Sequence, residues 1–275
     1  MKNKNLIYYW ASDLRSDSGE GILAKKYLIK LKQKNKKYKF LSINNNENEN
    51  FKSINSKYVK PILGIFRIWF YNFIGYKTCY INYLPLWNIF LFALLPKKTI
   101  LGPITGTVYN KSQNFYLSIR YNYFIKFLYK FSVLFLFKKW EKIIFSTNML
   151  KFEIPKKYIN RCKFNFVLED FDFKKVKNKK NNKNKKILFY YRQHQTKYNK
   201  ELLLNIKKLS KKIKIDVFGD KLYGDNFSNF GKISQNKYDR LLKKYDYTFN
   251  GLENLYSLHF LNSLKNNLKV FCDIN

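Results

Sequence analysis

Two basic residues just after an apolar run are the part of this sequence best suited to chemistry. The run Ile187–Tyr191 is followed at once by Arg192, and Lys197 comes five residues later. A strand that ends at cationic residues brings positive charge to the carboxyl edge of a parallel sheet, where doubly wound folds bind ligands. Arg offers a planar fork and Lys a point charge, so the pair predicts a diphosphate site. The alternative is that both are ordinary surface charges.

The segment 250–257 is a second candidate site. It follows a strand predicted over 247–249 and opens a helix predicted over 255–267. Free N–H groups at the helix N-terminus, at Asn254, Leu255 and Tyr256, would face phosphate oxygens. The carboxylate of Glu253, just before this helix, can accept hydrogen bonds from both hydroxyls of a ribose. The alternative is that Glu253 only stabilises the positive end of the helix.

Two loops in the first half of the chain also qualify as sites. Gly19, Glu20 and Gly21 lie between a first strand and a helix, where glycine permits a tight turn and a close backbone approach. Glu20 could contact a ligand there, or it could be a first-turn charge that stabilises the helix. The turn 102–106 follows an apolar strand, and its residues Gly102, Thr105 and Gly106 either line a ligand site or form a structural turn.

Histidine and cysteine offer weaker candidates. His194 lies between Arg192 and Lys197, where it either contacts the ligand of that pair or is an exposed loop side chain. His259 is expected to have no role. The three Cys (79, 162 and 272) are far apart and read as buried thiols in a reducing compartment. No His, Asp or Cys spacing suggests a metal site, so neither a metal nor a cofactor is expected.

Alternating strands and helices position these residues. In the first half we expect strands over 6–10, 38–43, 78–82, 99–101, 142–146 and 164–168, and helices over 22–31, 62–73, 84–95 and 116–140. In the second half we expect strands over 187–191, 213–218, 246–249 and 269–273, and helices over 199–210, 235–245 and 255–267. This order predicts an α/β fold with two Rossmann-like domains that face a cleft. The domains would be 1–170 and 187–275, joined by a Lys/Asn-rich linker over 171–186. The second is short for such a domain, so it is either a minimal version or a fragment.

The net charge of +36 favours anionic neighbours. Only six of the 54 basic residues are Arg, however, and the excess of Lys resembles the bias of an A+T-rich genome. The surplus Lys is therefore a solvated surface, a membrane-surface patch or, as a third alternative, a nucleic-acid site. The N-terminus does not read as a signal peptide, and the apolar segment 123–137 contains Lys126 and Lys130, which argues against a membrane span. We expect a cytoplasmic protein, with peripheral attachment to the inner face of the plasma membrane as an alternative. The residues that suggest attachment are Lys126, Lys130, Lys138 and Lys139 beside Tyr123, Phe127, Phe131 and Phe135.

Together, these motifs resemble bacterial GT-B glycosyltransferases of the large retaining group that build surface polysaccharides. The resemblance rests on Arg192 and Lys197, on the acidic motif at Glu253, and on the loops at Gly19–Gly21 and 102–106. One departure is the second acidic position of the family, which falls at Leu261 or Asn262 and is not acidic.

The resemblance implies a metal-independent transferase with two substrates, a nucleotide sugar and a glycan or lipid-linked acceptor in cell-envelope biosynthesis. Catalytic roles would fall to Glu20, Arg192 and Lys197. Donor contacts would come from Gly19, Gly21, Arg192, His194, Lys197, Glu253, Asn254, Leu255 and Tyr256, and acceptor-side contacts from Gly102, Thr105 and Gly106. The alternatives are an inactive or fragmentary relative and a basic nucleic-acid-binding protein.

Overall fold

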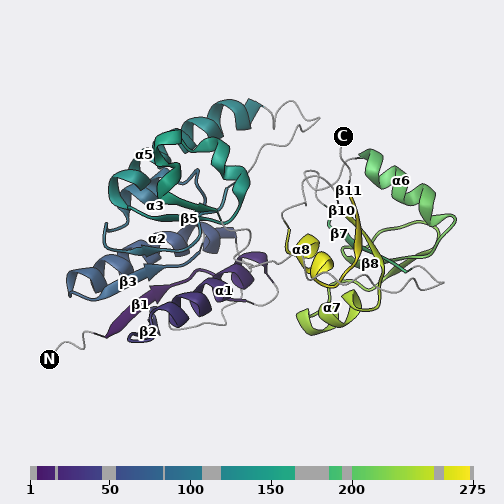
Figure 1. Cartoon of the computed structure of the whole chain (residues 1–275), viewed down its shortest axis with the longest axis horizontal. Coiled ribbons are helices and arrows are strands. Elements are labelled where there is room, and N and C mark those ends of the chain that lie inside the picture. The colour runs from purple at the N-terminus through teal and green to yellow at the C-terminus, as the bar shows by residue number, and fades with distance from the viewer. Residues whose placement is uncertain are drawn as a thin grey trace. The chain divides into compact units, whose positions relative to one another are not determined.

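The computed structural model divides the chain into two compact units, Met1–Glu169 and Asp170–Asn275 (Figure 1). The structure describes residues 5–15, 18–44, 54–82, 84–106, 119–164, 186–193, 200–250 and 257–272. Each unit has its own sheet, its own helices and its own hydrophobic core. The linker predicted over 171–186 stays a prediction, because all of it except Lys186 lies outside the described residues.

A four-stranded parallel sheet forms the centre of the first unit. Its strands are β1 (Leu6–Trp10), β2 (Lys39–Ser42), β3 (Lys77–Tyr80) and β4 (Ile100–Leu101), in the spatial order β2-β1-β3-β4. In β1, Ile7 pairs with Phe40 on one side and with Lys77 on the other. The carboxyl ends of β1 and β3 therefore lie side by side at one edge of the sheet.

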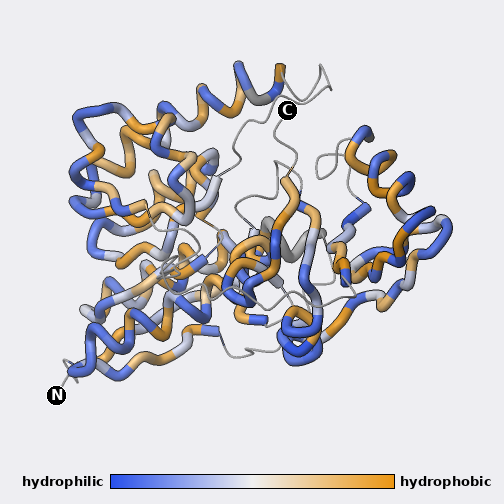
Figure 2. The backbone as a smooth tube through the Cα atoms, turned by 45° about the vertical axis from the view of Figure 1, so that its right-hand side comes forward, coloured by the Kyte–Doolittle hydropathy of each residue, from blue (hydrophilic) through white to orange (hydrophobic). Residues whose placement is uncertain are grey.

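Alternating residues of the central strands fill two cores, one on each face of the sheet. Ile7, Tyr9 and Cys79 face α1 (Gly19–Lys34). Trp10 and Tyr80 face a larger core that contains side chains from α2 (Ile54–Phe73), α3 (Ile89–Leu94) and α5 (Lys126–Lys139). This period of two is the physical reason why the strands could be recognised in the sequence. Figure 2 shows hydrophobic residues recurring along the strands and helices of both units.

Smaller elements complete the first unit. A π-helical segment, η1 (Arg120–Ile125), leads directly into α5, and two 3-10 helices span Asn148–Glu153 and Lys156–Arg161. The strands β5 (Ile143–Phe145) and β6 (Cys162–Phe164) pair in parallel, and a bridge from Ile104 to Phe145 connects this pair to the turn after β4.

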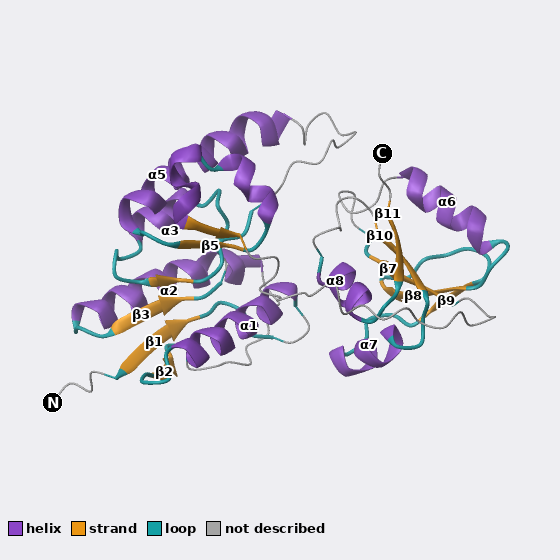
Figure 3. Ribbon diagram, in the orientation of Figure 1, coloured by secondary structure: helices purple, strands orange, loops and turns teal. Residues whose placement is uncertain are grey.

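The second unit contains a five-stranded parallel sheet in the order β11-β10-β7-β8-β9 (Figure 3). The strands are β7 (Ile187–Tyr191), β8 (Ile215–Gly219), β9 (Phe227–Asn229), β10 (Tyr247–Asn250) and β11 (Lys269–Cys272). The helix α6 (Lys200–Ser210) packs on one face of the sheet, where Ile206 meets Ile187 and Val217. On the other face, α7 (Gln235–Leu242) packs against Leu188 and Phe218, near α8 (Leu258–Lys265).

The α/β fold with two Rossmann-like units is confirmed by the parallel pairing in both sheets. Some boundaries were wrong. α2 begins at Ile54 rather than at 62 and contains Pro61. α3 begins only at Ile89, because the side chain of Asn88 caps it by accepting from the Leu91 N–H. Of the strand expected over 164–168, only Phe164 is described, as the last residue of β6, and the rest of that prediction lies outside the described residues. β9 was not predicted.

Candidate functional site

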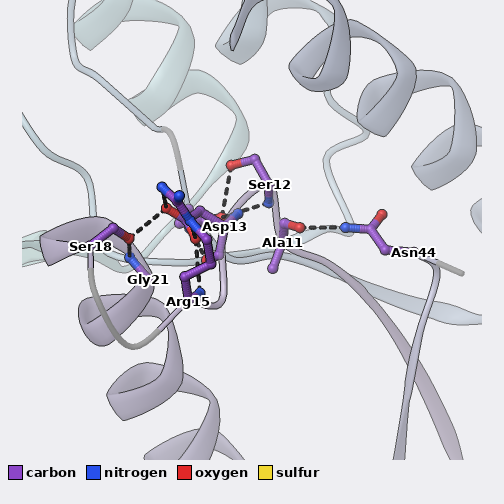
Figure 4. Close-up of polar contacts among 8 residues, drawn as sticks. Ala11, Ser12, Asp13, Arg15, Ser18, Gly21 and Asn44 are labelled. Atoms are coloured by element: carbon purple, nitrogen blue, oxygen red, sulfur yellow. Dashed lines mark hydrogen bonds and ion pairs between the residues drawn. The ribbon is translucent and has the colours of Figure 1, made fainter. Parts of the chain in front are cut away.

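The loop after β1 is fixed by an asparagine that follows β3. Asn82 is buried, and its Oδ1 accepts from the Ser12 N–H at 2.8 Å and from the Ser12 hydroxyl at 3.0 Å. Its Nδ2 donates to the Asp13 carbonyl at 2.6 Å. On the other side, the amide of Asn44 donates to the Ala11 carbonyl (Figure 4). Residues that follow three neighbouring strands thus hold this loop in one conformation.

Asp13 lies at the centre of this polar cluster. It is buried, and its carboxylate accepts from the backbone N–H of Arg15 at 2.8 Å, from Arg15 Nε at 3.2 Å and from the Ser18 hydroxyl at 2.5 Å. Burial alone raises the pKa of Asp13, but these hydrogen bonds and the charge of Arg15 lower it below its usual value. Asp13 therefore stays ionised and anchors Arg15, whose side chain is partly exposed.

The first turn of α1 packs closely on the same loop, and Gly21 makes this possible. The Ser18 hydroxyl caps the helix by accepting from the Gly21 N–H at 2.9 Å. A Cβ at Gly21 would lie 2.2 Å from the Arg15 carbonyl oxygen, so only glycine fits. A Cβ at Gly19 would meet nothing within 4 Å. The close approach expected of these glycines therefore belongs to Gly21 alone.

Glu20 has the opposite electrostatic character to Asp13. Its Oε2 is buried and has no hydrogen-bond partner among the described residues. Burial raises the pKa of Glu20, and the negative charge of Asp13 raises it further. Two carboxyl groups with pKa values shifted in opposite directions are typical of sites that use one group for proton transfer and the other for charge. This pair is the strongest chemical feature of the first unit.

Packing accounts for the glycines of the turn 102–106. A Cβ at Gly102 would lie 1.7 Å from the Ile81 carbonyl oxygen, and one at Gly106 would lie 2.6 Å from the side chain of Leu150. The Thr105 N–H donates to a backbone carbonyl at 3.0 Å. These contacts favour the structural alternative for Gly102 and Gly106, and the acceptor-side role of Thr105 stays a prediction.

In the second unit, Arg192 lies exposed directly after β7, at the carboxyl edge of the sheet, as the sequence predicted. The Gln193 N–H donates to Asp220 Oδ2 at 2.7 Å, and the Asp220 N–H donates to the Tyr191 carbonyl at 2.9 Å. Gly219 has a φ of +102°, and a Cβ there would lie 2.2 Å from the Tyr191 carbonyl oxygen. The ends of β7 and β8 are thus tied together just beneath Arg192.

His259 supports the neighbouring strand. Its ring lies within 2.9 Å of both the Tyr238 hydroxyl and the Thr248 hydroxyl, and burial lowers its pKa to about 3. It is therefore a neutral residue of the interior. At the end of the same strand, Asn250 Nδ2 is buried without a hydrogen-bond partner among the described residues.

Several predicted donor residues lie outside the described residues, namely His194, Lys197, Glu253, Asn254, Leu255 and Tyr256. Of the two positions where the family's second acidic residue falls, Leu261 is buried and Asn262 is half-buried in α8. No group of His, Cys, Asp or Glu that could hold a metal ion occurs within the described ranges.

The sequence reasoning missed Asp13, Arg15 and Asn82 as site residues. Asn82 lies 70 residues from Ser12, and no local pattern connects the two. The signal that could have pointed to the site is that a polar residue follows each of two apolar strands, Asp13 in the stretch 6–13 and Asn82 in the stretch 78–82.

No protein-family model matches this chain, and no curated protein matches it. Solved structures that resemble it include a protein assigned as a UDP-N-acetylglucosamine 2-epimerase from Listeria monocytogenes. That likeness has a TM-score of 0.47 and 6% identity over 90% of this chain and 74% of the other.

Heptosyltransferase WaaC of E. coli gives a TM-score of 0.33 and 10% identity, over 97% of this chain and 88% of the other. The glycotransferase of kitacinnamycin gives a TM-score of 0.37 and 7% identity, over 98% of this chain and 80% of the other. Likeness at this level assigns no activity, which has to come from the residues of this chain.

Proposed function

We propose that the protein is a glycosyltransferase. It would transfer a sugar from a nucleotide-sugar donor to a hydroxyl of a glycan or lipid-linked acceptor in cell-surface polysaccharide synthesis. The observation that carries the proposal is the pair of Asp13, which is buried, and Glu20, whose Oε2 is buried, with pKa values shifted in opposite directions near the carboxyl end of β1. The sequence resemblance to GT-B enzymes, in both halves of the chain, supports the same function.

Glu20 is assigned as the proton acceptor. A raised pKa makes its carboxylate a stronger base, and its Oε2, which has no hydrogen-bond partner among the described residues, would accept the proton of a substrate hydroxyl. The acceptor oxygen then forms a bond to the anomeric carbon of the sugar. The bond from that carbon to the diphosphate oxygen breaks, and the diphosphate leaves with the electron pair. Asp13 stays ionised and holds Arg15 beside the substrate hydroxyls.

Arg192 is assigned to the diphosphate. It is exposed at the end of β7, and a guanidinium group there stabilises the charge that develops on the leaving group. Lys197, five residues on, is proposed to share this role. Nothing in this step requires a metal ion.

The test is a thermal-shift panel of nucleoside diphosphates, followed by calorimetry. A ligand at about 100 times its Kd stabilises the fold by roughly 2.7 kcal/mol. A charge-assisted hydrogen bond is worth roughly 1.5–3 kcal/mol, so Arg192→Ala should weaken binding about ten- to a hundredfold. Arg240→Ala, at an exposed position of α7 in the same unit, is the matched control and should leave affinity unchanged. Equal nucleoside-diphosphate affinity in the wild type, Arg192→Ala and Arg240→Ala would show that Arg192 is not part of the site. No binding by the wild type would favour an inactive relative.

A further inference from the structure

α2 leaves a stripe of large apolar side chains in contact with solvent. The stripe recurs every three or four residues, and its members are Val59, Ile62, Leu63, Phe66, Trp69, Phe70 and Phe73. Phe66 is 68% exposed and Phe73 is 90% exposed. The opposite side of the helix, at Ile65 and Ile68, is buried in the core. The helix is thus apolar on both sides, whereas a surface helix of a globular protein is normally polar on its outer side.

The stripe continues onto two neighbouring helices. α3 exposes Phe90 and Leu94, and the indole Nε1 of Trp69 donates to the Leu94 carbonyl at 2.8 Å. Ile119, just before η1, is exposed, and the segment η1–α5 exposes Tyr123, Phe124, Phe127, Phe131 and Leu134. Lys139 of α5 donates to the Leu95 carbonyl at 2.9 Å, which fixes α5 against the end of α3. We call the exposed side chains of α2, α3 and η1–α5 together the aromatic face.

The segment that forms this face carries charge of a single sign. The segment 50–140 contains no Asp and no Glu, although the whole chain has 18 of them. The same segment contains 13 basic residues: Lys52, Lys57, Lys60, Arg67, Lys77, Lys97, Lys98, Lys111, Arg120, Lys126, Lys130, Lys138 and Lys139. Among those on or beside the aromatic face, Arg67, Lys97, Lys98, Lys126, Lys130 and Lys138 are exposed.

This combination selects one kind of partner. A second copy of the chain would bring one basic face against another, and like charges repel. A bilayer with anionic lipids offers negative headgroups for the Lys and an apolar layer for the aromatic side chains, which favour the interface. No helix among the described residues is long and apolar enough to cross a membrane. We propose that the aromatic face docks on an anionic bilayer and that its side chains enter the interfacial layer.

Two residues that suggested a membrane patch in the sequence do not belong to this face. Phe135 packs against the core. The ammonium group of Lys139 is held by the carbonyls of Ala93 and Leu95, and partial burial lowers its pKa. The face is therefore larger than the sequence suggested, because α2 and α3 contribute to it, but these two residues drop out. The proposal is independent of the proposed enzymatic activity.

The test compares two isoleucines of the first unit that are equally exposed. Ile62 on α2 and Ile29 on α1 are both 55% exposed, and only Ile62 lies on the aromatic face. The full chain and the variants Ile62→Asp and Ile29→Asp are floated with vesicles of phosphatidylcholine, alone or mixed with phosphatidylglycerol. We expect the wild type and Ile29→Asp to float with the mixed vesicles, and Ile62→Asp to bind about tenfold more weakly, because an apolar group no longer enters the interface.

Further variants separate the outcomes. Lys126→Glu with Lys130→Glu should also weaken binding to the mixed vesicles, whereas Lys207→Glu with Lys211→Glu, exposed in the second unit, should not. Equal unfolding temperatures would show that the variants fold. Wild-type protein that stays in the soluble fraction with the mixed vesicles would overturn the proposal. So would equal losses from Ile62→Asp and Ile29→Asp. Sedimentation as a dimer that Ile62→Asp converts to a monomer would assign the face to a second copy instead.

Discussion

At the scale of single residues, two carboxyl groups near the loop after β1 have different surroundings. Asp13 is surrounded by donors that keep it charged, whereas Glu20 has a buried oxygen without a hydrogen-bond partner in the part of the chain that the structure describes. The fold therefore keeps one carboxylate whose charged form is disfavoured by burial. Strain of this kind at a polar cluster is typical of a site kept for function rather than for stability.

Glu20→Gln should lower the rate of transfer and raise stability together. The amide cannot accept the proton of the acceptor hydroxyl, so kcat should fall about a hundredfold or more. The folded-state pKa of Glu20 lies above its unfolded value, so burying the carboxylate destabilises the fold as the pH rises through that range. The variant should therefore unfold at a higher temperature than the wild type at pH 8, and the difference should vanish at a pH below the unfolded pKa.

The measurements are kcat and the unfolding temperature across pH. Glu141→Gln, at an exposed position, is the control and should change neither. A kcat for Glu20→Gln within a few-fold of the wild type would point to an oxygen of the donor phosphate as the proton acceptor.

At the scale of elements, the contact between α1 and the loop before it depends on one of two neighbouring glycines. Gly21→Ala would place a Cβ 2.2 Å from the Arg15 carbonyl oxygen, so the helix must move, which should destabilise the protein by about 1–3 kcal/mol. Gly19→Ala meets nothing and should be neutral or stabilising by up to about 1 kcal/mol, because Ala favours the helix. Denaturant unfolding of both variants is the test, and equal destabilisation would contradict it.

The elements whose buried residues recur with a simple period could be predicted from the sequence. Both faces of β1 and β7 are buried by alternating residues, and the strands were found within one residue of their observed ends. β9 was missed because its three residues, Phe-Ser-Asn, form too short and too polar a run. α3 was predicted too long because the apolar residues before Asn88 resemble a helix, whereas Leu84 and Leu86 instead bond to the turn at Thr105.

The residues of the candidate site likewise divide into those whose positions the sequence predicts and those whose positions it does not. The positions of Arg192, Glu20 and Gly21 could be predicted because each stands next to a recognisable strand or helix, and their roles stay predictions. Asn82, which holds the loop of Asp13, could not be found, because its role exists only once β1 and β3 lie side by side. The aromatic face was found only in part, since exposure depends on which side of α2 meets the core.

At the scale of the whole molecule, the +36 charge opposes folding. Compact chains with a large excess of one sign repel themselves, and salt reduces this repulsion. Raising NaCl from about 0.1 M to about 1 M shortens the Debye length from about 10 Å to about 3 Å. We therefore expect the unfolding temperature of the free protein to rise by at least about 2 °C, which for a chain of this size corresponds to roughly 1 kcal/mol.

The same salt should weaken binding to anionic vesicles, because that attraction fades within a Debye length. An increase in stability together with weaker vesicle binding, both caused by added NaCl, is what an excess of positive charge predicts. A variant with Lys211→Gln, Lys212→Gln and Lys214→Gln, all exposed in the second unit, is the control. It should be more stable than the wild type at low salt and respond less to NaCl, yet bind vesicles through the aromatic face as before. An unfolding temperature that falls with NaCl, or an equal salt response in the variant, would show that the excess charge does not limit stability.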